Sequence, residues 1–259
     1  MLNRSAPEAP GEARCEVRAP APGNWAASEA PGEVRSEAEA TAPGARRHTR
    51  RGAATRELII SAAATLIFEK GVARTSIDDI RRATGVSGSQ MTHYFADKQA
   101  LVRAVIEHQV VRILHAHRQP QLGRLDSFAA LRAWADMVLE TQRRHQYSGG
   151  CPLGTLVSQL AADPVLRHDL AAGFARWQAL LADGLEQMRW RGELRADADP
   201  AQLALALLTA LQGGLLLTST RQDPTPLDAA LTAALFYVRS FATELTTPAG
   251  LPGPPTPPV

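Results

Sequence analysis

One stretch of this chain decides the fold of its N-terminal part: Thr75–Lys98, which reads T-S-I-D-D-I-R-R-A-T-G-V-S-G-S-Q-M-T-H-Y-F-A-D-K. It contains two capping boxes, because Ser76 is followed three residues later by Asp79, and Ser87 three residues later by Gln90. In a capping box the two side chains satisfy backbone amides at the first turn of a helix. The stretch therefore predicts two short helices in close succession.

The turn between these helices contains Gly85, which suits the left-handed backbone conformation that a sharp turn requires. Two short helices joined in this way form a helix-turn-helix, whose second helix enters the major groove of DNA. On that helix Met91 and Phe95 are four residues apart, so they share the face that packs into the core. The other side chains then point outward and suit base edges and phosphates. The alternative is a polar helix face between two ordinary turns.

The distribution of charge favours nucleic-acid binding. The net charge of the chain is +2, but residues 1–45 carry −3, residues 46–107 carry +5 and residues 108–259 are neutral overall. A basic block of this kind is typical of a surface that docks on phosphates. Arg46 and Arg47 precede the first helix and are expected to reach phosphates or a minor groove. The residues expected to contact DNA are Arg50, Arg51, Thr75, Ser76, Ser87, Ser89, Gln90, Thr92, His93, Tyr94 and Lys98.

Composition and periodicity divide the chain into four segments. Residues 1–45, rich in Ala, Pro, Glu and Gly, cannot bury enough apolar surface to fold and are expected to form a disordered tail. Residues 46–96 are expected to form the helix-turn-helix domain, and residues 97–246 a larger helical domain. Residues 247–259 are a Pro-rich tail. The first basic residues are not followed by the apolar run of a signal peptide, so no signal peptide is expected.

Helical periodicity continues through the larger domain, so the predicted fold class is all-α. The last two helices are expected over residues 200–220 and 226–245. The most apolar run, Leu203–Thr218, contains two glycines and is shorter than the ~20 residues of a membrane span. It is better explained as a buried or interface helix. We expect a cytoplasmic protein without membrane contact, and a chain with two cysteines fits a reducing compartment.

Residues 50–106 resemble the N-terminal domain of the TetR family of transcriptional regulators. The resemblance rests on F-E-K-G-V-A-R-T-S-I-D-D-I-R-R-A-T-G-V-S-G-S-Q-M-T-H-Y-F-A-D-K-Q-A-L, and on the frame G-V-S…Y-F-x-x-K-x-x-L within it. It implies a three-helix DNA-binding domain, a helical effector-binding domain, and a homodimer on a palindromic operator of double-stranded DNA. The side chains that it places on the recognition helix are Gln90, Thr92, His93 and Tyr94, with Lys98 at the phosphate-contacting start of the next helix.

Parts of the C-terminal half resemble a subgroup that includes repressors of multidrug-efflux genes and of aldehyde- or electrophile-responsive genes. These parts are G-G-C-P-L-G-T-L, R-G-E-L and L-Q-G-G-L-L-L. The resemblance implies that Trp134, Phe174 and Trp177 lie on helices that wall an effector cavity, although aromatic residues at helical spacing are also ordinary core. It further implies a four-helix bundle at the dimer interface, where small residues between Ala204 and Gly214 allow close approach.

Cys151 is the fourth residue expected to bind the effector. It follows two glycines and precedes a predicted helix, where amide dipoles lower the pKa of a thiol, so a redox or electrophile sensor is one interpretation. A small buried apolar residue is the other. His108, His115 and His117 lack a Cys or carboxylate at ligand spacing, so a solvated helix face is expected there. We predict no metal and no cofactor.

The sequence thus predicts a DNA-binding repressor that a small hydrophobic effector releases from its operator. Two alternatives stay open: a repressor that senses redox state or electrophiles through Cys151, and an effector-independent activator with a filled C-terminal core. No enzyme is expected, because G-x-S-x-G, H-E-x-x-H, Walker A and G-x-G-x-x-G motifs are absent from the sequence.

Overall fold

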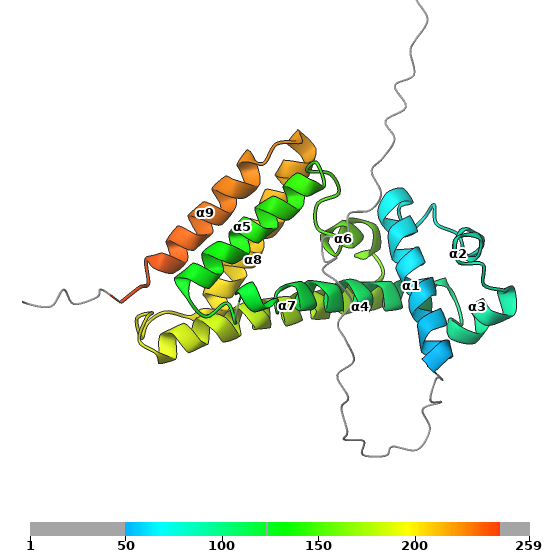
Figure 1. Cartoon of the computed structure of the whole chain (residues 1–259), viewed down its shortest axis with the longest axis horizontal. Coiled ribbons are helices and arrows are strands. Elements are labelled where there is room, and N and C mark those ends of the chain that lie inside the picture. Colours follow the sequence, from blue (N-terminus) through cyan, green and yellow to red (C-terminus); the bar gives the residue numbers. More distant parts are fainter. Residues whose placement is uncertain (1–49, 123, 244–259) are drawn as a thin grey trace, which may run out of the picture.

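A computed structural model describes residues 50–122 and 124–243 as an assembly of α-helices (Figure 1). The helices are α1 (Arg50–Lys70), α2 (Ile77–Thr84), α3 (Gly88–Tyr94), α4 (Lys98–Ala116), α5 (Phe128–Arg144), α6 (Gly154–Leu160), α7 (Pro164–Trp190), α8 (Pro200–Arg221) and α9 (Thr225–Arg239), with a 3-10 turn at Pro120–Leu122. The predicted all-α fold class is confirmed. Within the described ranges the strand-type pairing is limited to one isolated bridge, between Leu194 and Ala242.

Some predictions fall on residues that the structure does not describe. These are the two tails, residues 1–45 and 247–259, and the arginines Arg46 and Arg47. The boundary predicted between residues 96 and 97 stays a prediction.

Capping side chains and glycines with positive φ set the ends of the N-terminal helices. Gly71, with φ 83°, ends α1, and Gly85, with φ 71°, ends α2. Both predicted capping boxes form, at Ser76 for α2 and at Ser87 for α3. The prediction of two short helices from the spacing in this stretch is confirmed.

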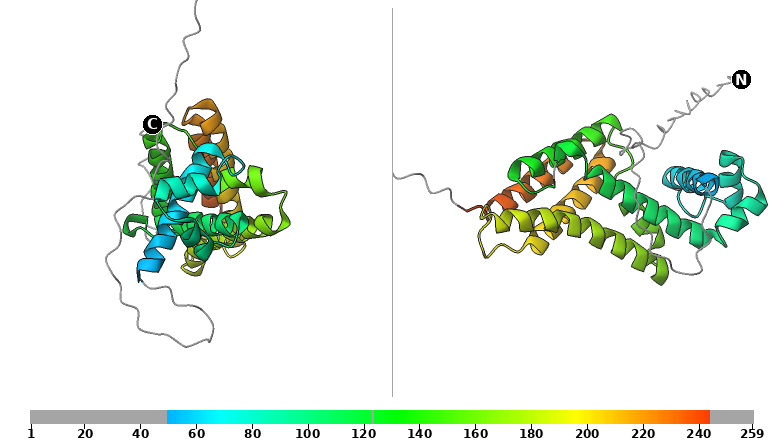
Figure 2. Two further views of the ribbon diagram at one scale, coloured as in Figure 1. Left: turned by 90° about the vertical axis from the view of Figure 1, so that its right-hand side faces the viewer. Right: turned by 60° about the horizontal axis from the view of Figure 1, so that its bottom comes forward.

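Helix α4 connects the two parts of the molecule. It begins at Lys98 because the carboxylate of Asp97 accepts the amide of Ala100, at 2.7 Å. Its apolar side chains are buried against α1 on one side and α7 on the other. Helices α1 to α3 lie at one end of the molecule and α5, α8 and α9 at the other (Figure 1), and α4 and α7 run side by side between them (Figure 2). A shift of α4 therefore moves the N-terminal helices relative to the rest.

The C-terminal part is built on α8, which packs against both α7 and α9, while α5 packs on α9. Helix α9 ends at Arg239 and not at the predicted residue 245. The chain leaves the helix there to bond with the loop after α7: the amide of Arg195 donates to the carbonyl of Phe241, and that of Thr243 to the carbonyl of Glu193. These long-range hydrogen bonds take the place of helical ones. Sequence periodicity does not reveal them, so it predicted too long a helix.

One described helix, α8, is long and apolar enough to cross a membrane by length and composition. Its most apolar window is 44% buried inside the protein, as expected for a helix that packs against two neighbours. Core helices of soluble proteins pass the same test, so this is weak evidence for a membrane span.

Candidate functional site

The outer face of α3 presents the side chains that the sequence placed there. Met91 and Phe95 are buried and join α3 to the core of the three-helix unit. Ser89, Gln90, Thr92 and His93 are exposed on the opposite side, and Tyr94 is half-buried beside His93 with its ring edge-on. The orientation predicted for α3 is confirmed. Whether these side chains read bases stays a prediction.

Four residues predicted to contact DNA use their side chains for hydrogen bonds to other groups of the protein. The hydroxyl of Thr75 is buried and donates to the carbonyls of Leu66 and Gly71, which holds the turn after α1. This corrects the expectation that its side chain faces DNA. Ser76 and Ser87 are exposed caps whose hydroxyls accept the amides of Asp79 and Gln90. Lys98 donates its Nζ hydrogen to the carbonyl of Val72, at 2.7 Å, so its charge is half-buried against the α1–α2 turn.

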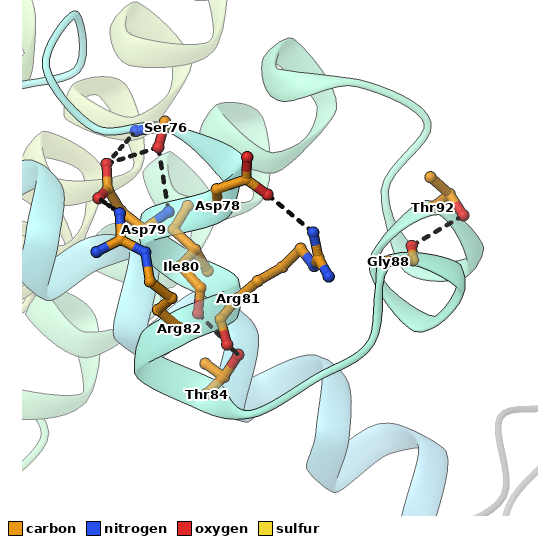
Figure 3. A network of polar contacts seen from close by, with 9 residues as sticks. All are labelled: Ser76, Asp78, Asp79, Ile80, Arg81, Arg82, Thr84, Gly88 and Thr92. Carbon is orange, nitrogen blue, oxygen red and sulfur yellow. Dashed lines mark hydrogen bonds and ion pairs between the residues drawn. The ribbon is translucent and has the colours of Figure 1, made fainter.

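A network of polar and charged side chains lies along α2 and its N-cap (Figure 3). Arg82 pairs with Asp79, and Arg81 pairs with Asp78 at 2.8 Å. Hydrogen bonds from Ser76, with the arginine charge, lower the pKa of Asp79 to about 2, so this carboxylate is ionised at neutral pH. The cap therefore keeps its acceptor, which stabilises the first turn of α2.

Two arginines, Arg50 and Arg51, lie exposed at the start of α1. They extend the basic surface at the end of the molecule that carries α3. Guanidinium groups suit phosphate oxygens, which fix the register of a protein on a duplex without reading its sequence.

Polar contacts join the end of the molecule that carries α1 to α3 to the helices α6 and α7. The side chain of Gln159 on α6 accepts the amide of Val72 at 2.7 Å, while Lys98 binds the carbonyl of the same residue. Further along, Gln99 donates to Asp163 at 2.9 Å, and Arg103 pairs with Asp169 at 2.6 Å. Through these contacts α6 binds the α1–α2 turn, and α7 with its N-cap residue binds α4.

The opposite end of α4 carries a buried aromatic cluster, the His117 cluster, formed by His117, Trp134 and Trp177. The ring Nδ1 of His117 lies 2.7 Å from the carbonyl of Ile113, so Nδ1 carries the hydrogen and Nε2 is an acceptor. That one nitrogen accepts both indole N–H groups, from Trp134 at 2.8 Å and from Trp177 at 3.1 Å. Burial lowers the pKa of His117 to about 4, so the ring is neutral at physiological pH.

The prediction of a solvated helix face was therefore wrong for two of the three histidines. His117 is buried, and His108 is half-buried with Nδ1 2.9 Å from Glu57, whereas His115 is exposed. The available signal was spacing: Val110, Ile113 and His117 recur at helical intervals on one buried stripe. Among the described residues no group of three or more His, Cys, Asp or Glu side chains could hold a metal ion.

A small cavity lies beside the His117 cluster, between α5, α7, α8 and the segment before α6. Its volume is about 30 Å³, room for one or two waters, and its lining residues are His117, Met137, Val138, Thr141, Gln142, Gly150, Cys151, Pro152, Trp177, Leu211 and Leu215. Of the predicted ligand-binding residues, Trp177 and Cys151 line this cavity. Trp134 does not, because it is fully buried behind His117, and neither does Phe174, which stacks on Trp177 with ring centroids 6.4 Å apart.

Two polar groups of this region were missed in the sequence. Gln142 is buried in the cavity wall, and its Oε1 has no hydrogen-bond partner within the described protein. Gln212 on α8 lies beside Cys151, and its Nε2 is likewise buried without a partner. Their positions one helical turn from Val138 and Leu208, both buried, were the signal in the sequence.

The thiol of Cys151 differs from the sensor expected at a helix start. It is buried, and burial raises its pKa even though it accepts the amide of Gly154 at 3.3 Å. A protonated, shielded thiol is a poor nucleophile, so the expectation of a lowered pKa is corrected.

Helices α8 and α9, which pack against each other, expose five large apolar side chains between them. Leu216 is 66% exposed and Phe236 75% exposed. The other large apolar side chains exposed on these two helices are Leu205, Leu217 and Tyr237. Single exposed apolar residues are ordinary, but a set concentrated on two packed helices marks an interaction surface.

Comparisons with known proteins agree with this geometry. Residues 59–105 match the family described as bacterial regulatory proteins, tetR family, and residues 127–234 match the tetracyclin repressor-like, C-terminal domain. The transcriptional regulator AcuR of Cereibacter sphaeroides is 30% identical over 208 residues, which cover 78% of this chain and 92% of that protein. The chain belongs to the TetR family. It is thus a DNA-binding transcriptional regulator, and its family is one of regulators and not of enzymes.

Solved structures place both parts of this TetR regulator in the same architecture. A TetR regulator from Chloroflexus aurantiacus has a TM-score of 0.65 at 26% identity, covering 75% of this chain and 98% of that one. The regulatory protein TetR from Rhodobacter sphaeroides has a TM-score of 0.60 at 28% identity, covering 71% of this chain and 98% of that one. The helix-turn-helix and the helical C-terminal part are shared across these relatives.

Proposed function

We propose that this TetR regulator is a homodimeric repressor that leaves a palindromic operator when a small hydrophobic effector enters its C-terminal part. The observation that supports an effector site is the small cavity beside the His117 cluster, because apolar walls with a few polar groups are typical of small-molecule sites. Its walls are mainly apolar, while Gln142 offers a buried oxygen without a partner. A ligand that donates a hydrogen bond would satisfy that oxygen.

The cavity must enlarge to receive an effector, since about 30 Å³ is far below the several hundred Å³ of a typical ligand site. Enlargement pushes on Trp177, Cys151 or the segment leading into α6. Because α6 holds the α1–α2 turn through Gln159, such a displacement reaches the DNA-binding end directly. In this mechanism the effector shifts the population toward a spacing of the two α3 helices that no longer fits successive major grooves.

The homodimer is supported by the exposed apolar face of α8 and α9. Two copies of this helix pair would bury Leu216 and Phe236 in a four-helix bundle, the arrangement expected for a self-complementary interface. In this arrangement Phe236→Asp gives a monomer in sedimentation velocity, whereas Val111→Asp on the exposed side of α4 leaves the dimer intact.

The experiment for the whole proposal is selection of operators from randomised DNA duplexes by the full chain, followed by titration of the selected site. We expect an inverted repeat, and an affinity that falls about tenfold in Thr92→Ala or His93→Ala. Arg132→Ala on α5, whose side chain pairs with Asp136, serves as the control. A folded dimer that selects no sequence would contradict the proposal.

A second candidate function, effector-independent regulation, is favoured by the small size of the cavity. A thermal-melting screen of apolar compounds distinguishes the two candidates. It compares the wild type with Val138→Trp, whose larger side chain fills the cavity. A compound that raises the melting temperature of the wild type alone and weakens operator binding supports effector release. No such compound, with intact operator binding, supports the second candidate. Cys151→Ser should behave as the wild type towards electrophiles, because the thiol is buried.

A further inference from the structure

A second hollow in the C-terminal part, the basic groove, lies between the end of α4, the following loop and α7. Its charged lining residues are Arg118 on α4, Arg124 in the loop, and Arg176 and Asp183 on α7. The groove has a volume of about 520 Å³, within the range of sites for small molecules. It shares one lining residue, the buried His117, with the small cavity beside the His117 cluster, and the other lining residues of the two hollows differ.

The groove carries an excess of positive charge that the described protein does not neutralise. Arg176 donates to Glu107 at 2.6 Å, so its charge is already paired. Within residues 50–122 and 124–243, the guanidinium groups of Arg118 and Arg124 form no side-chain hydrogen bond or ion pair. Asp183 is the acidic lining residue. Guanidinium groups bind carboxylates and phosphates through two parallel hydrogen bonds, so two unpaired ones beside one hollow favour an anion.

Backbone packing holds the loop side of the groove in place. Helix α7 approaches the loop so closely at Gly184 that a Cβ there would lie 2.4 Å from the carbonyl oxygen of Leu125 and 2.7 Å from that of Arg124. Leu125 is fully buried and has φ 56°, a left-handed conformation fixed by this packing. The backbone of Arg124 is therefore anchored on α7, and its side chain extends from a fixed point.

The groove also has an apolar side. Leu114 on α4 and Leu180 on α7 are half-buried lining residues. A ligand with a short hydrocarbon body would cover these side chains while its charged head lies at the arginines. Neither a bare inorganic ion nor a neutral apolar molecule would use both kinds of surface.

DNA is not the anion that this groove fits. Helix α4 has 19 residues, so its two ends are separated by about 28 Å. Helix α3 lies near the first end (Figure 1), and the groove lies at the second end, because its lining includes Leu114, His117 and Arg118. From these observations we propose that the basic groove binds a small organic anion, a carboxylate or phosphate monoester with a short apolar body, whose head lies between Arg118 and Arg124. This site does not depend on the effector cavity.

The test uses octanoate and octyl phosphate as probes, with octanol as the uncharged control, measured by isothermal titration calorimetry on the full chain. We expect one or both anions to bind the wild type, and to bind the double variant Arg118→Gln/Arg124→Gln at least about tenfold more weakly. Octanol should bind at least about tenfold more weakly than the anions, and added salt should weaken anion binding. Preference for one anion identifies the head group.

The matched control is Arg132→Gln/Arg144→Gln, which removes two exposed arginines of α5 that lie outside the groove. It should bind the anions as the wild type does. Circular dichroism melting shows whether the groove variant is folded. Equal anion binding by the wild type and a folded groove variant would overturn the proposal, since the anion would then bind elsewhere. Absence of binding by both anions at millimolar concentration would overturn it as well.

Discussion

The two ends of α4 differ in the sequence separation of the contacts that hold the structure there. At the first end, α2 and α3 begin through side-chain contacts three residues apart. At the second end, His117 binds Trp134 and Trp177, which lie 17 and 60 positions further along. The starts of α2 and α3 are thus specified locally, whereas the His117 cluster depends on long-range packing. Local specification lets the first end keep its shape while the second changes.

The comparison predicts its largest effect in the buried cluster. Trp134→Ala removes a fully buried indole and leaves His117 with one donor in place of two, so the free energy of unfolding should fall by about 4 kcal/mol in urea titrations. Trp190→Ala is the matched control, because Trp190 is 78% exposed, and its effect should stay within about 0.5 kcal/mol. Equal effects of the two substitutions would remove the distinction between the cluster and the surface.

The second prediction concerns backbone packing in the same half. In Gly184→Ala the new methyl group meets two carbonyl oxygens of the loop, which cannot rotate away as a side chain can. Unfolding free energy should fall by about 2 kcal/mol. Gly88→Ala, where the nearest side-chain atom is 3.7 Å from the new Cβ, should change it by less than about 0.5 kcal/mol. A stable Gly184→Ala protein would mean that the loop is free to move.

The third prediction is a pH dependence confined to the His117 cluster. The pKa of His117 is about 4 in the folded protein and 6.5 when unfolded, so below pH 6.5 the unfolded chain takes up a proton that the folded protein excludes. Stability is therefore lost as pH falls, by about 2 kcal/mol between pH 7 and pH 5. Urea titrations at both pH values should show a smaller loss in His117→Gln. The same loss in both proteins would rule out His117 as its source.

The smallest effect is expected at the recognition helix. Ser87→Ala removes the cap of α3 and should lower the unfolding free energy by about 1 kcal/mol. Ser61→Ala, at an exposed position within α1, serves as the control and should change the unfolding free energy by less than about 0.5 kcal/mol. If Ser87→Ala is neutral, α3 is held by Met91 and Phe95 alone, and the local explanation of this end is insufficient.

The same difference decides what could be predicted from the sequence. The helix-turn-helix, its caps and the burial of Met91 and Phe95 follow from spacings of three and four residues. Such spacings could not predict the role of His117, because its hydrogen-bond partners lie on other helices and are known only once those helices are packed against it. Thr75 was misassigned for the same reason, since its acceptors are backbone carbonyls that sequence patterns do not display.

The cavity was predicted only in part. Trp177 and Cys151 line it, but Trp134 and Phe174 do not, although these two aromatic residues lie on helices that contribute to the cavity wall. Which side of a buried aromatic ring faces a cavity depends on rotamers and on neighbouring helices, and periodicity determines only that the residue is buried.

Val72 has a consequence for how the state of the protein can be observed. Its amide donates to Gln159 of α6 and its carbonyl accepts from Lys98 of α4, so this one residue is held by two different helices. If α6 withdraws, the amide loses its acceptor and is free to exchange its hydrogen with water, while the bond to Lys98 keeps the turn in place. The exchange rate of this single hydrogen would then report the position of α6, and it would do so without DNA, effector or label.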